Sequence, residues 1–441
     1  MIVSSAFAGK TYAVLGLARS GLATVETLVA SGARVVAWDS REEARSQVAG
    51  KAELGDPMEI DLAGFDGIVV SPGVPLNRHP IAMRAKLAGV PIIGDIELLA
   101  RPTLPPHKVV GITGTNGKST TTALIHHIIE QAGYPTVMGG NIGLPILSQP
   151  PLEPNLKGAG VYVLELSSYQ IDLTHSLDCD VAVLLNITPD HLDRYDGFEG
   201  YVASKMRLFL MQSFSNIAVI GEDDREADEV VYKLHHDHGR WENVQQFNRL
   251  TITPEQQERW PSLQGPHNAQ NAAAAIMVGQ ALGIDEATIA NALASYASLP
   301  HRMQAVGTRN GVLYVNDSKA TNAASTAPAL AAWPARDGKP RIHWILGGVA
   351  KSDNLDECAP HFGNVAHAYT IGEAGHMFAD LLRPHMAVDD SEMLSAAVRR
   401  AARIAQPGDV VLLSPACASF DQFRDFEARG DAFAAAVAAL E

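Results

Sequence analysis

The ten residues Gly111-Ile-Thr-Gly-Thr-Asn-Gly-Lys-Ser-Thr120 decide the fold. An apolar, β-branched run leads into the glycines, and a helix is predicted from Thr121. Glycines let backbone N–H groups curve around phosphate oxygens, the helix N-terminus adds a positive dipole, and Lys118 adds a charge. The hydroxyl of Ser119 is placed to reach Mg²⁺. This context predicts a nucleotide phosphate loop, although only two residues separate Gly114 from Gly117; the alternative is a glycine-rich turn beside an incidental lysine.

The chain around this loop is long and acidic. It has 441 residues, of which 34 are Lys or Arg and 49 are Asp or Glu, a formal charge of −15. Such a length predicts two to four domains, and the 46% hydrophobic content excludes a largely disordered chain. The acidic balance argues against general binding of nucleic acid or of a membrane surface.

Cysteine usage and the termini indicate the compartment. Cys179, Cys358 and Cys417 lie far apart, which favours neither a disulfide framework nor a zinc site. No apolar run is long enough to span a bilayer, and no basic segment marks the N-terminus as a signal peptide. A cytoplasmic protein without a membrane span is therefore expected.

Short β-branched runs alternate with helically spaced segments along most of the chain, which predicts βα units around parallel sheets. A proline-rich joint at 101–106 and a second joint at Pro300 divide the chain into three α/β domains, 1–101, 102–299 and 300–441. A helix is predicted over 267–282, and the charged stretch 222–241 is interpreted as a surface excursion. The predicted strands are 11–17, 33–39, 67–71, 91–94, 108–113, 161–166, 181–187, 217–220, 312–316, 342–346, 368–371 and 410–413.

Several polar groups follow the predicted strands of the first two domains. Gly16-Leu-Ala-Arg-Ser-Gly21 and Asp39 are similar to a dinucleotide-binding turn, with a merely tight turn as the alternative. Ser71-Pro-Gly73 belongs to the same sheet edge. Glu165 ends an apolar strand, either as a functional carboxylate or as a salt-bridged core residue. The segment Asp190-His191-Leu-Asp193 suits a divalent ion or a phosphate, or is simply a polar loop.

Other clusters stay open on their residues alone. Lys205 is best interpreted as a solvated surface lysine. Asn268 and Asn271 either cap a helix or bind an adenine edge, and Arg302 either reaches a phosphate or is an exposed joint residue. The loops 316–322 and 414–419 follow strands and are rich in polar groups, with helix capping as their alternative interpretation.

Taken together and in this order, the segments resemble the Mur ligase family. The resemblance covers nearly the whole chain and rests on 114–120, Glu165-Leu-Ser-Ser168, Asp190-His-Leu-Asp-Arg194, 267–271, His301-Arg302 and Leu346-Gly-Gly348. Within the family, 316–322 and 414–423 look like the D-glutamate-adding member, and no Asp-Asn-Pro-Arg signature of the diaminopimelate- or lysine-adding member is present. The resemblance implies a Rossmann-like N-terminal domain that binds UDP, a central P-loop ATPase domain and a Rossmann-like C-terminal domain that binds the amino acid.

The resemblance also implies residue roles. Catalytic roles are implied for Lys118, Glu165, His191 and Lys205, and Mg²⁺ ligation for Ser119, Glu165, His191 and a carbamylated Lys205. The implied ATP contacts are Gly114, Thr115, Asn116, Gly117, Lys118, Ser119, Thr120, Asn268, Asn271, Arg302 and Asp317. The UDP-muropeptide contacts are Arg19, Ser20, Asp39, Ser40, Arg41, Ser71, Gly73 and Asn141. The D-glutamate contacts are Lys319, Thr321, Lys351, Ser419 and Phe426.

The implied activity is ATP-dependent addition of D-glutamate to UDP-N-acetylmuramoyl-L-alanine through an acyl phosphate, in cytoplasmic peptidoglycan precursor synthesis. A monomer is expected, with these three small molecules as partners and no nucleic acid. An L-glutamate-adding relative is the alternative. An NAD-dependent oxidoreductase would leave 114–120 without a role, a non-catalytic UDP-sugar-binding protein would use only the first domain, and folylpolyglutamate synthase lacks this N-terminal domain.

Overall fold

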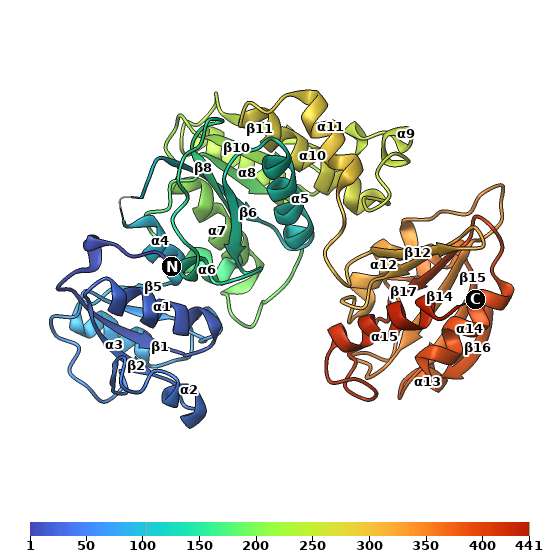
Figure 1. Cartoon of the computed structure of the whole chain (residues 1–441), viewed down its shortest axis with the longest axis horizontal. Coiled ribbons are helices and arrows are strands. Elements are labelled where there is room, and N and C mark those ends of the chain that lie inside the picture. Colours follow the sequence, from blue (N-terminus) through green and yellow to red (C-terminus); the bar gives the residue numbers. More distant parts are fainter. Residues whose placement is uncertain (103, 441) are drawn as a thin grey trace. The chain divides into compact units, whose positions relative to one another are not determined.

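The computed structural model describes residues 1–102 and 104–440, and its chain divides into two compact units. One unit comprises Met1–Asn248 with Ala273–Ala292, and the other comprises Arg249–Ala272 with Leu293–Glu441. Three sheets with flanking helices are distributed over these units (Figure 1). The prediction of a three-domain α/β protein is confirmed, whereas the limits 1–101, 102–299 and 300–441 stay predictions.

The first sheet is wholly parallel, with the order β3-β2-β1-β4-β5. Its central strands are apolar and buried, so that both faces need helices. β1 ends at Leu15, whereas the strand was predicted to continue to Leu17. The difference arises because Gly16 turns the chain with a φ of +94°. The elements are β1 (Thr11–Leu15), α1 (Arg19–Ala30), β2 (Arg34–Trp38), α2 (Glu42–Ser46), β3 (Glu53–Leu54), β4 (Gly67–Val70), α3 (Ile81–Ala88), β5 (Ile92–Ile93) and α4 (Asp95–Ala100).

The second sheet is also parallel, in the order β11-β10-β9-β6-β8-β7. Its strands are β6 (His107–Thr113), β7 (Thr136–Gly140), β8 (Gly160–Glu165), β9 (Val181–Leu184), β10 (Ile217–Gly221) and β11 (Val244–Phe247). The helices of this stretch of the chain are α5 (Lys118–Gln131), α6 (Ser168–Asp172), α7 (Gly197–Leu210), α8 (Arg225–His236), α9 (Pro254–Gln257), α10 (Pro266–Ala281) and α11 (Glu286–Ser295). Of these, α9 and the first part of α10 belong to the other unit.

The interpretation of 222–241 as a surface excursion is wrong. Most of this stretch forms α8, which is capped by Asp224 and buries Val230 and Leu234. Arg240 beyond the helix is 3% exposed and donates to the carbonyl of Phe209. The high density of charges conceals an amphipathic pattern with one narrow apolar face.

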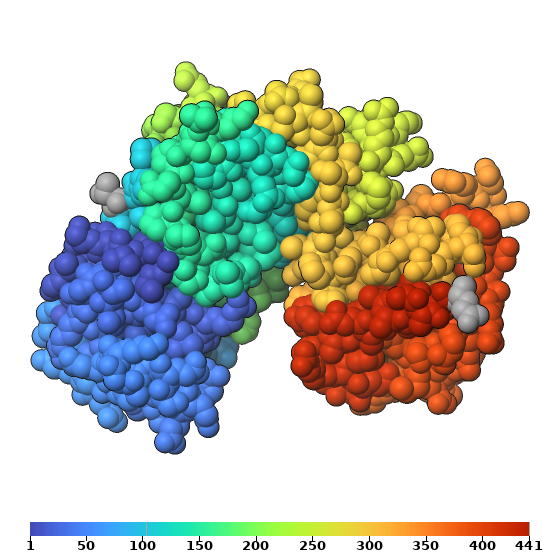
Figure 2. All heavy atoms as spheres, in the orientation of Figure 1, coloured from blue at the N-terminus to red at the C-terminus, as the bar shows by residue number. Residues whose placement is uncertain are grey.

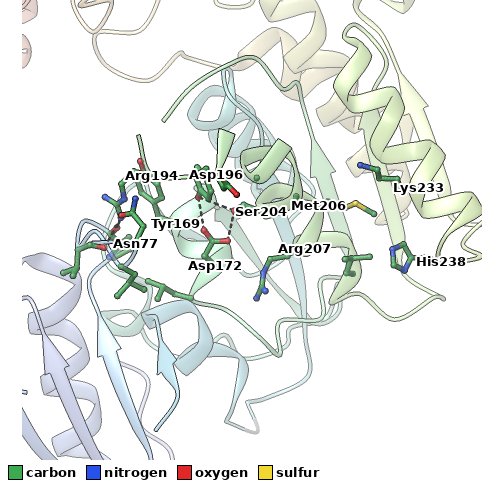
Figure 3. A pocket seen from close by; sticks show the side chains of 18 of the residues that line it. Asn77, Tyr169, Asp172, Arg194, Asp196, Ser204, Met206, Arg207, Lys233 and His238 are labelled. Carbon is green, nitrogen blue, oxygen red and sulfur yellow. Dashed lines mark hydrogen bonds between the residues drawn. The ribbon is translucent and has the colours of Figure 1, made fainter. Parts of the chain in front are cut away.

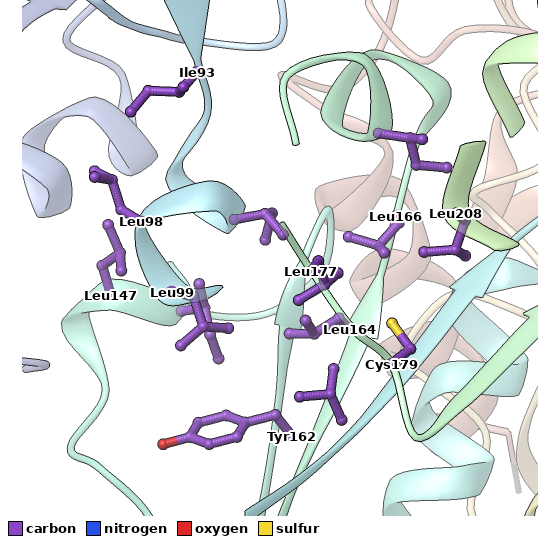
Figure 4. Close-up of a cluster of buried hydrophobic side chains, with 14 of the residues drawn as sticks. Ile93, Leu98, Leu99, Leu147, Tyr162, Leu164, Leu166, Leu177, Cys179 and Leu208 are labelled. Carbon is purple, nitrogen blue, oxygen red and sulfur yellow. The ribbon is translucent and has the colours of Figure 1, made fainter. Parts of the chain in front are cut away.

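The first two sheets share one unit, and their domains pack directly against each other. The N–H of Ile2 donates to the carbonyl of Leu147, and that of Gly94 to the carbonyl of Leu173. Figure 2 shows the blue N-terminal residues abutting the teal and green central ones. A continuous apolar core joins the two, with Leu98 and Leu99 of α4 near Leu147 and the side chains of β8 (Figure 4).

The third sheet has the order β12-β13-β17-β14-β15-β16, with β12 and β13 antiparallel and the other pairs parallel. The functional loops after β13, β14 and β17 therefore meet at one edge. The elements are β12 (Gln304–Arg309), β13 (Val312–Asn316), α12 (Ala323–Ala331), β14 (Ile342–Gly347), β15 (Val365–Ile371), α13 (Gly375–Leu382), β16 (Ala387–Glu392), α14 (Leu394–Ile404), β17 (Val410–Leu413) and α15 (Phe426–Ala438). Among the described residues, no helix is long and apolar enough to cross a membrane.

Candidate active site

The glycine-rich loop predicted to bind phosphate forms between β6 and α5, and its binding of a nucleotide stays a prediction. Gly114 and Gly117 adopt φ values of +152° and +83°, which a side chain rarely allows. α5 begins at Lys118, three residues earlier than expected, so that the N–H groups of Lys118, Ser119 and Thr120 belong to its first turn. Lys118 Nζ donates to the carbonyls of Gly114 at 2.9 Å and Thr115 at 2.8 Å. The loop thus presents a cation and helix N–H groups, the arrangement that suits phosphates.

Asn186, which the sequence interpretation missed, supports this loop from the end of β9. Its Oδ1 accepts from the N–H of Asn116 at 2.9 Å, and its Nδ2 donates to the carbonyl of the same residue at 3.2 Å. Its own carbonyl accepts from the N–H of Thr115 at 2.9 Å. Its position just after β9 was the only local signal, because its distance from Asn116 along the chain hides the contact.

Lys205 is not the solvated surface lysine that its residue context favoured. It lies on the inner face of α7 and is 1% exposed. Its Nζ donates to the carbonyl of Gly114 at 2.8 Å and lies 4.6 Å from the ring centroid of Tyr201. Burial, with the nearby charge of Lys118, holds the pKa of Lys205 well below its ordinary value.

The segment after β9 approaches Lys205 through aromatic rings. His191 has a positive φ of +53°, and its imidazole contacts Asp190, Tyr169 and Tyr201. The ring of Tyr201 thus has His191 at one side and the Lys205 amine over its face. His191 itself is exposed, as a ligand-accessible imidazole must be.

Glu165 ends β8 and is 2% exposed. Asn141 Nδ2 donates to its Oε1 at 3.1 Å, while Oε2 has no hydrogen-bond partner within the described residues. None of the ion pairs within the described residues includes Glu165, so the alternative interpretation of Glu165 as a salt-bridged core residue is wrong. A buried, unsatisfied carboxylate oxygen beside a phosphate loop fits a hard divalent cation.

The predicted magnesium ligands do not form a protein-only cage. Within residues 1–102 and 104–440, no group of three or more His, Cys, Asp or Glu side chains could hold a metal. This agrees with the character of Mg²⁺, which takes one or two protein carboxylates and fills its shell with water and phosphate oxygens. The donors Ser119, Glu165 and His191 therefore fit Mg²⁺ only together with a bound phosphate.

The predicted UDP contacts gather at the carboxyl edge of the first sheet. Asp39 accepts from the N–H of Leu17 at 2.8 Å and pairs with the Arg41 guanidinium at 3.1 Å, which lowers the pKa of Asp39 to about 2. Ser71 Oγ donates to the carbonyl of Gly16 at 3.0 Å. A Cβ on Gly16 would approach Ser71 Oγ to 2.7 Å, so the turn requires glycine. Ser20, Ser40 and Gly73 occupy the same three strand ends, and Arg19 donates to Gly143 beside Asn141.

Two further residues of this edge escaped the sequence interpretation. Arg45 donates to the carbonyls of Asp39 and Ser40 and lies over the Trp38 ring. Asp95 at the start of α4 is 5% exposed, and burial raises its pKa to about 6. Neither residue follows a recognisable motif.

The predicted amino-acid residues are brought together at the edge of the third sheet. Lys319 Nζ lies 4.1 Å from the ring centroid of Phe426, and Lys351 Nζ is 3.2 Å from Thr321 Oγ1. Ser419, 2% exposed, follows β17 on a neighbouring loop. The helix-capping interpretation holds for Asn322, which caps α12, whereas Ser414 caps nothing and donates to Asp317.

The predicted adenosine and phosphate contacts belong to the second unit. Asn268 and Asn271 are both 2% exposed on α10, and Asn271 Nδ2 donates to Asn268 Oδ1 at 3.0 Å. Asn268 lies inside α10, which begins at Pro266, and its Nδ2 donates to the carbonyl of Gln264, so it does not occupy the N-cap position that its composition favoured. Asp317 accepts from Met303 N–H and Ser414 Oγ, and burial raises its pKa to about 7 despite Arg302 nearby. Their contacts with ATP stay a prediction.

A cavity of about 630 Å³ lies within the first unit, and none of the predicted site residues lines it (Figure 3). Arg194, which follows the His191 segment, stacks on Tyr169 at 4.2 Å and donates to the carbonyl of Val74 at 2.9 Å. Asp172 accepts from both Tyr195 and Ser204 on another wall. Several polar groups of the lining thus bond to other parts of the protein, whereas Nε of Arg207 in the same lining has no hydrogen-bond partner within the described residues.

Comparison with known proteins agrees with this geometry. Three family models match: the Mur ligase MurD-like N-terminal domain over 10–94, the Mur ligase middle domain over 112–279, and the Mur ligase glutamate ligase domain over 301–417. The UDP-N-acetylmuramoylalanine--D-glutamate ligase of Novosphingobium aromaticivorans is 64% identical, covering 100% of this chain and 97% of the relative. The enzyme of that name from Sphingopyxis alaskensis is 61% identical, covering 100% of both chains. The solved UDP-N-acetylmuramate-alanine ligase MurC from Thermotoga maritima has a TM-score of 0.55 at 16% identity, covering 97% of this chain and 99% of that one.

The sheets, the phosphate loop and these matches define a class: the chain belongs to the Mur ligase family. The predicted resemblance is thereby confirmed. Full-length identities of 61–64% place it, within that family, in the branch of the UDP-N-acetylmuramoylalanine--D-glutamate ligases.

Proposed function

We propose that this chain joins D-glutamate to UDP-N-acetylmuramoyl-L-alanine with hydrolysis of ATP, in the cytoplasm and as a monomer. Full-length relatives carrying this enzyme's name support the overall activity. The observation that carries the mechanism is the convergence of Lys118 and the buried Lys205 on the carbonyl of Gly114. The fold supplies three sheet edges with polar loops, which suits a reaction of three substrates.

The reaction needs activation because a carboxylate is a poor acyl donor. Transfer of the γ-phosphoryl group of ATP to the L-alanyl carboxylate gives an acyl phosphate, whose leaving group is phosphate rather than oxide. Lys118 and the N–H groups at the start of α5 stabilise the charge that develops on the transferring phosphoryl oxygens. The neutral amine of D-glutamate then attacks the acyl carbon, and phosphate leaves as the amide forms.

Ser119, Glu165 and His191 are the residues that would hold Mg²⁺ in this site. When bound with the nucleotide, the metal neutralises phosphate charge and so lets two anions approach. Asn141 orients the Glu165 carboxylate through its hydrogen bond to Oε1, which leaves Oε2 as the free acceptor. Asp190 contacts His191 and fixes the imidazole on the same loop.

We infer carbamylation of Lys205, and its buried environment supports the inference. The neutral amine is the species that attacks CO₂: a bond forms between Nζ and the carbon, and one proton leaves Nζ, so an N-carboxylate remains. Burial to 1% exposure disfavours the ammonium form that would resist this step. The product replaces the neutral amine beside Lys118 with an anion, which could ligate Mg²⁺ with His191.

The D-glutamate pocket lies at the C-terminal sheet edge in this proposal. Lys319, Lys351, Thr321 and Ser419 provide cationic and hydroxyl donors for two carboxylates, while Phe426 fixes the Lys319 side chain. Arg302, Asp317, Asn268 and Asn271 complete the nucleotide contacts. The edge of the first sheet, with Asp39, Arg41 and Ser71, binds the UDP-muropeptide.

Mass spectrometry of the product tests the proposal and its alternative together. Full-length protein is incubated with ATP, Mg²⁺ and UDP-N-acetylmuramoyl-L-alanine, and with either D-glutamate or L-glutamate. We expect the glutamate adduct of the muropeptide with the D-isomer at a rate far above that with the L-isomer. A faster reaction with L-glutamate would support the L-glutamate-adding alternative, and no adduct with either would contradict the proposal.

A further inference from the structure

Arg429 is the most deeply buried cation of the C-terminal domain. It lies in the first turn of α15 and is 1% exposed. None of the ion pairs within the described residues includes it. Burial lowers the pKa of Arg429 to about 10, so the guanidinium still carries its charge at neutral pH. A buried cation without a paired carboxylate is costly, and its retention calls for a role.

Its guanidinium instead donates to two loops and to one strand end at the edge of the sheet. Nε donates to Ser318 Oγ at 2.9 Å and Nη2 to the Ser318 carbonyl at 2.9 Å. Nη1 lies 3.3 Å from the carbonyl of Ala418 and 3.4 Å from that of Gly347. Ser318 and Ala418 lie in the loops after β13 and β17, and Gly347 is the last residue of β14.

The bonded residues are sequence neighbours of the proposed D-glutamate contacts. Ser318 immediately precedes Lys319, and Ala418 immediately precedes Ser419. The same helix turn supplies Phe426, whose ring lies 4.1 Å from Lys319 Nζ and whose carbonyl accepts from Ser318 Oγ at 2.8 Å.

The backbone is tightly packed around the guanidinium of Arg429. Gly348 has a φ of +129°, and a Cβ there would approach the Ala418 carbonyl oxygen to 2.2 Å and Arg429 Nη1 to 3.2 Å. Val349 and Ala418 exchange backbone hydrogen bonds at 2.9 Å in each direction. The loops that carry Lys351 and Ser419 are therefore joined at the point where the guanidinium bonds.

We propose that Arg429 is a positioning and specificity-determining residue of the amino-acid pocket: its guanidinium fixes the loops bearing Lys319 and Ser419, and its charge favours a dicarboxylate amino acid. This inference rests on the proposed function. Hydrogen bonds fix the geometry of the two neighbouring donors. Asp421 lies close enough to raise the pKa of Arg429 but forms no ion pair with it, so the two carboxylates of D-glutamate add negative charge to a site where the guanidinium has no directly paired carboxylate.

Steady-state kinetics of full-length Arg429→Lys and Arg429→Met separate this role from a purely structural one. We expect Arg429→Met to raise the KM for D-glutamate about tenfold or more, while the KM for the UDP-muropeptide stays within about twofold. Arg429→Lys keeps the charge without the fork of donors, so its KM for D-glutamate should lie between those of Arg429→Met and wild type. Phe433→Leu, one turn later on the same helix and 0% exposed, is the matched control for lost stability.

The control should lower the melting temperature without changing the KM for D-glutamate. An unchanged D-glutamate KM in Arg429→Met, or an equal rise for all three substrates, would overturn the inference. If Arg429→Met does not fold, Arg429→Lys decides: a KM for D-glutamate within about twofold of wild type overturns it equally. A wild-type chain without D-glutamate-dependent turnover would contradict the proposed function instead, before any variant is compared.

Discussion

Lys205 Nζ and Lys118 Nζ donate to the same backbone oxygen, the carbonyl of Gly114, at 2.8 and 2.9 Å. Two cations at one carbonyl repel each other, and burial adds to the cost of charging Lys205. Lys118 is the lysine of the phosphate loop. Of the two amines, that of Lys205 is therefore the one suited to become an anionic carbamate.

Replacing Lys205 with alanine should abolish most turnover, lowering kcat about 100-fold or more, because the site would lose the anionic carbamate proposed to bind Mg²⁺ with His191. Added short-chain carboxylic acids should restore part of the activity by occupying the space of the carbamate. The measurement is kcat against carboxylate concentration. Lys118→Ala is the control, since a carboxylate cannot replace its cation. Full activity of Lys205→Ala at normal Mg²⁺ dependence would refute carbamylation.

Replacing Lys319 with alanine should weaken D-glutamate selectively. Loss of charge-assisted hydrogen bonds costs about 1.5–3 kcal/mol, or a roughly 10- to 150-fold higher KM for D-glutamate. The KM for the UDP-muropeptide should hardly change, because that ligand is assigned to the first sheet. Lys339→Ala, at an exposed lysine of the same domain, is the control. Equal weakening of both substrates would show that the pocket is misassigned.

Much of this arrangement could be predicted from the sequence, because strand ends and glycine-rich turns are local. The loop at 114–120 and the carboxylate of Glu165 lie where short-range patterns predict them. The burial of Lys205 could not be predicted from the neighbouring sequence. α7 points this side chain inward, and its hydrogen-bond partner, the carbonyl of Gly114 after β6, is distant in sequence. Asn186 and Arg429 act through backbone groups of loops distant in sequence, which no spacing encodes. Likewise, the many charged residues of α8 concealed its narrow apolar face, so the sequence did not predict this helix.

Asn186→Ala should loosen the phosphate loop. It removes two side-chain hydrogen bonds to Asn116, and a net loss of about 1 kcal/mol each predicts a several-fold to roughly 30-fold higher KM for ATP. The KM for D-glutamate should stay constant. Asn216→Ala, which removes a hydrogen bond to Asp178 at the other end of the sheet, serves as the comparison. An unaltered KM for ATP would exclude Asn186 as a support of the loop.

Asp317 predicts a pH-dependent stability. Burial raises its folded-state pKa from 3.8 to about 7, so between these values the folded chain binds more protons than the unfolded chain. The contribution of the protonated carboxyl to stability is present below pH 3.8 and is lost as the pH rises towards 7. The side chain of Asn in Asp317→Asn does not titrate. The free energy of unfolding of this variant, relative to that of wild type, should therefore increase as the pH rises through this window. Denaturant unfolding at several pH values measures the difference, and a constant difference would contradict the assignment.

The most direct test of the central claim is phosphate release from ATP by the full-length chain, measured with each substrate omitted in turn. The account predicts rapid release only when UDP-N-acetylmuramoyl-L-alanine and D-glutamate are both present, with one phosphate released per amide bond formed. Release that is independent of either substrate, or none with all three, would contradict it.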